Sequence, residues 1–188
     1  MIEVQKTPSE RVSQGDIYKN IEFIESITEA DGIIEINKII FPYVIVLTQD
    51  CDLAQDFTFR SEDSKTDDKL ILSVLVAPIY NAELFFIGEH LSELGRTMQE
   101  INIYKKGKKL TTDAKNLFQN DTPRYHYLEF KRDLDMVPSV IDFKHYFSLN
   151  LNYLYEIRKT NFVFKISELY REDISQRFAS FLSRIGLP

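Results

Sequence analysis

The sequence has a single cysteine, no long hydrophobic run and no excess of positive charge, and each of these shortages excludes a class of protein. Cys51 alone cannot form a disulfide within the chain. There is no apolar run of about 18 residues and no charged-then-apolar leader, so we expect a soluble, cytoplasmic protein with no membrane partner. Twenty-three Lys and Arg against 29 Asp and Glu give a net charge of −6, which disfavours binding driven mainly by attraction to a polyanion.

The chain is long and apolar enough for one good core. Its 188 residues, 44% of them hydrophobic, predict a single domain over 1–188. The most apolar stretch, residues 41–47, predicts a strand buried on both faces that ends in Gln49-Asp50-Cys51-Asp52. Residues 70–78 predict a second strand of this kind, which Pro78 would end. Because the connection between these two strands is short, we expect them to be antiparallel neighbours.

The remaining pattern alternates between strands and helices. Residues 17–24 and 34–36, on either side of Asp31-Gly32, predict a hairpin, and 56–68 predicts a polar surface loop. Apolar residues spaced by three and four predict one helix through residues 84–101, and a shorter helix follows at 112–118. Further strands are predicted at 124–130, 136–143 and 161–166, with 144–156 extended or in a short helical turn. A helix at 167–186, capped by Ser167 and ended by Gly186, has an apolar stripe that predicts packing on the sheet.

This order of elements resembles the MazF/PemK toxins. The resemblance is carried by Gly15-Asp16-Ile17, the hairpin, the strand at 42–48, the strand ending near Pro78, and Ser139-Val140-Ile141-Asp142 before a terminal helix. It implies an α+β fold with an SH3-like β-barrel built from 15–80 and 122–166, a helical insertion at 81–121 and a closing helix at 167–186. It also implies a bacterial toxin-antitoxin or antiviral phage-defence context and RNA as a substrate. The segments 49–53, 124–128 and 181–188 further resemble uncharacterised bacterial proteins of this barrel type.

Two departures from the toxin pattern bear on activity. Phe41 stands where the toxins have a catalytic Arg, and 78–81 offers no catalytic Thr. A ribonuclease of this type needs a cation to stabilise charge developing at the phosphate. We therefore expect a non-catalytic interaction or regulatory module without a cofactor, working with a larger partner protein or as a homodimer. The alternative is a metal-independent endoribonuclease with relocated catalytic groups drawn from Arg124, His126 and Asp142.

Cys51 supports a second alternative, a cysteine hydrolase or a metal-binding protein. His126 or His145 could act as its base or as further metal ligands. However, Asp50 and Asp52 would raise the pKa of the thiol, and no pair of ligands has zinc-motif spacing. The structural interpretation is a buried or half-buried cysteine, with Asp50 and Asp52 capping the turn after the strand. In the functional interpretation the two carboxylates contact a cation or a basic partner.

Two further sets of residues are candidates for contact with RNA, DNA or a protein. One set combines a cation with rings that can stack on bases, although alternating aromatic residues in a strand more often belong to a core: Arg124, Tyr125, His126 and Tyr127. The other set is a cluster of lysines that could contact phosphates or could simply form a solvated turn: Lys105, Lys106, Lys108 and Lys109.

Overall fold

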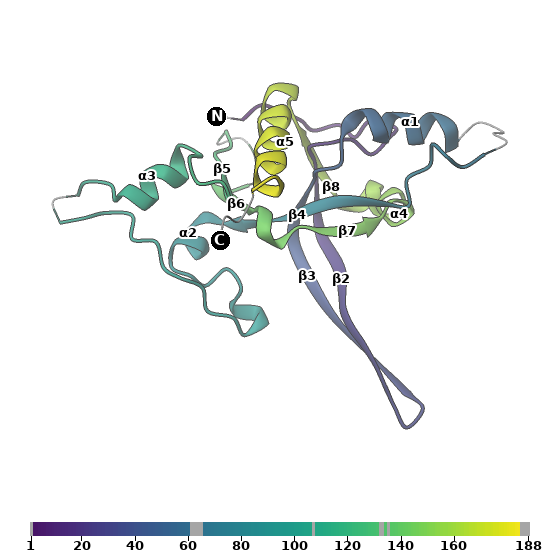
Figure 1. Cartoon of the computed structure of the whole chain (residues 1–188), viewed down its shortest axis with the longest axis horizontal. Coiled ribbons are helices and arrows are strands. Elements are labelled where there is room, and N and C mark those ends of the chain that lie inside the picture. The colour runs from purple at the N-terminus through teal and green to yellow at the C-terminus, as the bar shows by residue number, and fades with distance from the viewer. Residues whose placement is uncertain (1, 61–65, 107, 132–133, 135, 185–188) are drawn as a thin grey trace.

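The computed structural model describes residues 2–60, 66–106, 108–131, 134 and 136–184. It is an α+β fold in which helices surround a strongly curled antiparallel sheet (Figure 1). The strands are β1 (Val4–Gln5), β2 (Asp16–Ala30), β3 (Ile33–Val46), β4 (Ser73–Asn81), β5 (Tyr125–Leu128), β6 (Ser139–Asp142), β7 (Phe147–Asn150) and β8 (Phe162–Ile166). The helices are α1 (Asp50–Arg60), α2 (Ala82–Phe86), α3 (Thr112–Phe118), α4 (Leu151–Asn161) and α5 (Glu168–Leu182), with 3₁₀ turns η1 (Ser92–Leu94) and η2 (Phe143–His145). Among the described residues, no helix combines the length and apolarity needed to cross a bilayer.

The sheet curls until its two edges approach each other. Its strand order is β1-β8-β2-β3-β4-β6-β5, with β7 paired to β4. An isolated parallel bridge joins Ile2, next to β1, to Phe130, next to β5, and the Ile2 amide donates to the Glu129 carbonyl at 3.0 Å. β3 and β4 are antiparallel neighbours, with Val46 opposite Val76, which confirms the predicted pairing.

The hairpin is confirmed and is much longer than predicted, because residues 34–36 and 41–46 belong to one strand, β3. Asp31 and Gly32 form its turn with φ of 53° and 76°, the left-handed conformation that Asp-Gly turns favour. β8 borders β2 only at Asp16–Tyr18, and β4 borders β3 only at Val44–Val46. The remaining length of the two strands leaves the body as a two-stranded ribbon (Figure 1).

The core forms where the curled sheet meets α5 and α4. The apolar stripe of α5 is confirmed, since Ile174, Phe178 and Phe181 are buried against sheet residues. Ser167 is the N-cap residue of α5, as predicted, although its side chain forms no capping hydrogen bond. Gly186 lies outside the described residues. A second apolar cluster lies between the sheet and α4, and a third lies beneath the 81–121 segment.

Several predicted elements are wrong because tertiary contacts override local pattern. Residues 84–101 do not form one helix: α2 ends at Phe86, and Gly88, with φ of 76°, bonds to Met98 through its carbonyl. Residues 56–60 are helical rather than loop, because Asp56 is buried and accepts from the Ile71 amide; 61–65 lie outside the described residues. Pro78 lies inside β4 instead of ending it. Residues 144–156 are extended in β7, as one of the two predicted alternatives has it, but α4 is longer than a short helical turn.

Candidate functional site

One face of the ribbon is lined with exposed isoleucines. Directly opposed residues of an antiparallel pair share a face, and the register places Ile27 opposite Ile36, with a bulge between Ile24 and Ser26 that keeps Ile24 on the same face. Because side chains alternate between the two faces of each strand, five isoleucines lie on this one face, which we call the isoleucine face: Ile24, Ile27, Ile34, Ile36 and Ile40. Each of them is between 50% and 64% exposed.

The opposite face of the ribbon differs in character. At the base, Phe23 and Phe41 pack on Phe147, with ring centroids 4.8 and 4.9 Å apart. Further out most residues are polar, and the Asn37 amide donates to the Ser26 hydroxyl at 3.0 Å, while Ile33 is exposed beside the turn. The base is therefore anchored in the core on one side, while the isoleucine face has no covering element among the described residues.

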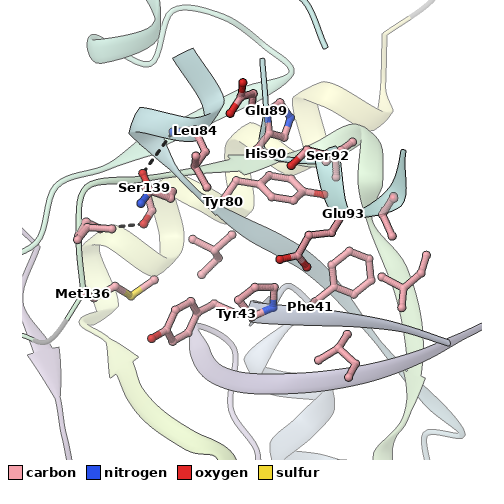
Figure 2. A pocket seen from close by; sticks show the side chains of 18 of the residues that line it. Phe41, Tyr43, Tyr80, Leu84, Glu89, His90, Ser92, Glu93, Met136 and Ser139 are labelled. Atoms are coloured by element: carbon pink, nitrogen blue, oxygen red, sulfur yellow. Dashed lines mark hydrogen bonds between the residues drawn. The ribbon is translucent and has the colours of Figure 1, made fainter. Parts of the chain in front are cut away.

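A cavity of about 580 Å³ opens at the base of the isoleucine face. Lys38 and Ile40 line it from β3, and the 84–94 segment forms its far wall. Figure 2 shows the Glu93 carboxylate directed between the ring of Tyr80 and the rings of Phe41 and Tyr43. The volume is within the range of pockets that hold a small ligand or a large side chain, and its wall combines apolar surface with carboxylate.

Beside this cavity, Tyr80 contacts a partly buried polar cluster. Arg124 donates two bonds to Asp142, from Nε at 2.8 Å and from Nη2 at 2.5 Å. The ring nitrogen Nδ1 of His145 lies 3.3 Å from Asp142 Oδ2 and 3.1 Å from the Tyr80 hydroxyl. Burial lowers the pKa of His145 and raises that of Tyr80, so both groups are neutral at pH 7.

The neighbouring His90 is also neutral. Its ring packs on Tyr80 and Phe85, with centroids 4.8 and 4.7 Å apart, and burial lowers its pKa to about 4. His90 lines the cavity, so this part of the wall offers aromatic surface rather than charge. Sequence reasoning missed both His90 and Tyr80 because only the fold brings β4 and the turn that follows α2 to the polar cluster.

The structure brings together Arg124 and Asp142, two of the three predicted ribonuclease residues, and separates them from His126. Asp142 lies opposite Tyr125 in the β5–β6 pair, whereas His126 lies opposite Ile141 on the other face. His126 is 3% exposed, and burial lowers its pKa to about 3. Its Nε2 is 3.9 Å from Asp173, on the side of α5.

Cys51 is exposed in the first turn of α1, so the expected buried or half-buried cysteine is wrong. Its sulfur lies 3.6 Å from both Gln49 Oε1 and Asp52 Oδ1. Within the described ranges, no three His, Cys, Asp or Glu side chains are grouped as a metal site would need, so the structure does not assemble Cys51, His126 and His145.

Asp50 joins distant parts of the chain instead of capping a local turn. It accepts two bonds from Arg11, at 3.0 and 2.7 Å, and one from the Gln14 amide at 3.1 Å. Arg171 of α5 lies 3.3 Å away. Burial alone would raise the pKa of Asp50, but the bonds from Arg11 lower it below its ordinary value. The role of Asp50 is to fix the N-terminal segment and α5 at the end of β3.

The predicted contact residues fall into two groups. Tyr125 and Tyr127 are half-buried and pack edge-on against Phe85 and Phe118, each at 4.9 Å, which favours the core interpretation. The four lysines lie at the tip of a small hairpin, closed by a bridge between Tyr104 and Leu110, and all are exposed.

Comparison with known proteins does not assign this chain to a family. The chain matches no protein-family model, and no curated protein matches it with statistical significance. The MazF/PemK resemblance and the bacterial defence context therefore stay predictions.

Proposed function

We propose that this protein is a non-catalytic protein-interaction module whose contact surface is the isoleucine face. The observation that carries this proposal is the placement of five half-exposed isoleucines on one side of a projecting ribbon. Apolar side chains gathered on one exposed face mark interaction sites in soluble proteins, whereas single exposed isoleucines need no explanation.

The shape of the ribbon supports the same proposal. Past Phe23 and Ile39 it extends for about 25 Å as two strands alone. A two-stranded hairpin is only marginally stable in water. Covering half-exposed isoleucines would contribute on the order of 5 kcal/mol, because complete burial of one such side chain is worth about 1.5 to 3 kcal/mol. A partner on this face would therefore stabilise the ribbon as well as bind it.

The polar cluster supports a role without catalysis. In the ribonuclease alternative, Arg124 would have to bind a phosphate, yet the bonds from its Nε and Nη2 go to Asp142. His145 and His90 are neutral and share their surroundings with apolar rings, which suits a structural network. The curled sheet, with its edges bridged at Ile2 and Phe130, supports our finer assignment of the fold as a divergent SH3-like barrel.

The test compares the two faces of the ribbon by cysteine labelling. In a Cys51→Ser background, Ile36→Cys reports on the isoleucine face and Thr28→Cys on the opposite face. We expect a maleimide to label Ile36→Cys several-fold more slowly in a lysate of the producing cells than in dilute purified protein, because a bound protein covers it. Thr28→Cys serves as the matched control and should react equally in both. Equal rates for Ile36→Cys in the two samples would refute the proposal.

The ribonuclease alternative predicts a different result. Purified protein should leave single-stranded RNA intact with or without a divalent metal if the module proposal is right. Cleavage that is abolished by Arg124→Ala or Asp142→Asn, with folding retained, would replace the proposal with the enzyme.

A further inference from the structure

The ribbon and the cavity carry more carboxylates than their own cations neutralise. Lys38 pairs with Glu22 at 2.7 Å, and Arg96 lies 3.9 Å from Glu25. Four other carboxylates on or beside the isoleucine face have no ion pair within the described part of the chain: Glu29 and Asp31 near the tip, and Glu89 and Glu93 at the cavity. The complete surface is therefore apolar and acidic, and an occupant should be apolar and basic.

The lysine hairpin, residues 103–106 and 108–111, has the complementary character. Its limbs are held by bonds from the Thr111 amide to the Ile103 carbonyl at 2.9 Å and from the Lys105 amide to the Lys109 carbonyl at 2.7 Å. Its four exposed lysines form no ion pair with any described residue. Tyr104 and Leu110, which flank them, are 63% and 45% exposed. Positive charge and uncovered apolar side chains thus lie together at one tip.

We propose that the isoleucine face and its adjoining cavity bind the lysine hairpin of a second copy of this chain. This inference rests on the proposed function and names the partner. Tyr104 and Leu110 would cover isoleucines, and the lysines would lie against Glu29 and the carboxylates at the cavity. A lysine entering the cavity would also meet the aromatic faces of Tyr43 and Tyr80, which attract cations.

One molecule cannot make this contact with itself. Figure 1 shows the ribbon and the segment around α3 and the lysine hairpin leaving the body in different directions. The two surfaces differ, so two copies can each offer a hairpin to the other's ribbon and form the contact twice. Direct stacking of two isoleucine faces would instead bring acidic residues against acidic residues, because Glu22 and Glu29 outnumber Lys38 on that face.

A charge swap tests the contact. Sedimentation should show a mass above the 22.1 kDa of one chain that rises with protein concentration and falls with added salt. E29K/E93K and K105E/K109E should each weaken self-association by about tenfold or more, because like charges then face each other. An equimolar mixture of the two variants should restore it, since both contacts in the mixed pair are again complementary. E156K/E172K, which reverses two exposed carboxylates on α4 and α5, is the matched control and should associate like the unaltered chain.

Cross-linking provides a second measurement if a charge-reversed variant does not fold. In the Cys51→Ser background, a short bismaleimide should join Ile36→Cys of one copy to Lys106→Cys of another, and should not join Thr28→Cys to Lys106→Cys. A monomer at every concentration, association that survives both reversals, or a mixture that fails to restore it would overturn this inference. If the chain is monomeric and Ile36→Cys is nevertheless shielded in lysate, the proposed function stands and its partner is a different protein.

Discussion

Truncation of Phe178 tests whether α5 is an integral part of the fold. Its ring is 6% exposed and packs on Phe143 and Tyr146, with ring centroids 5.5 and 5.4 Å away. Phe178→Ala removes those contacts and leaves a cavity between α5 and the sheet that the rigid strands cannot fill. We expect the free energy of unfolding to fall by about 3 to 5 kcal/mol and the melting temperature to fall by on the order of 10 °C.

Urea denaturation followed by circular dichroism measures this change, and the denaturant slope should stay constant. Leu182→Ala is the matched control on the same helix: its side chain is 49% exposed, so its truncation should cost less than about 1 kcal/mol. Equal, small effects for the two variants would refute the packing of α5 on the sheet. That result would mean that the apolar stripe of α5 faces solvent or a missing partner.

Three further predictions concern single polar residues. Burial raises the pKa of Asp16 from 3.8 to about 6, so the folded state holds that proton more tightly than the unfolded chain does. The free energy of unfolding should therefore decline by up to about 3 kcal/mol as pH rises from about 4 to above 6. Asp16→Asn should flatten this decline in urea titrations at several pH values, and an unchanged dependence of stability on pH would contradict the role of Asp16. Arg124→Ala should lower the free energy of unfolding by about 3 kcal/mol, because it leaves the fully buried Asp142 carboxylate without its ion-pair partner. Adding Asp142→Asn should recover part of that stability in thermal unfolding, and no recovery would point to another role for the pair. Cys51→Ser should change stability by less than about 0.5 kcal/mol, because the thiol is exposed; a larger loss in the same assay would show that Cys51 is a packing residue.

Local pattern predicted the strands and the terminal helix well, and for identifiable reasons. Residues 41–47 are apolar on both faces, and a strand of that kind has to lie inside a sheet. The stripe through Ile174 and Phe178 has the helical repeat and ended up buried. The prediction of one helix over 84–101 was wrong, because the same spacing of apolar residues is also compatible with a short helix, a glycine turn and an extended segment packed on α3 and β5.

The sequence by itself determined which residues are apolar, where the chain turns at Asp31-Gly32 and that its acidic charge exceeds its basic charge. It could not show that β2 and β3 continue past the sheet, because alternating isoleucines look the same whether a neighbouring layer covers them or not. The tertiary structure decided that, by ending β4 and β8 early along the hairpin and leaving the isoleucine face bare. It also decided that Arg124 is bound to Asp142 while His126 points away, since that depends on which strand lies opposite. Burial and partnership depend on residues distant in the chain, and only the folded arrangement fixes them.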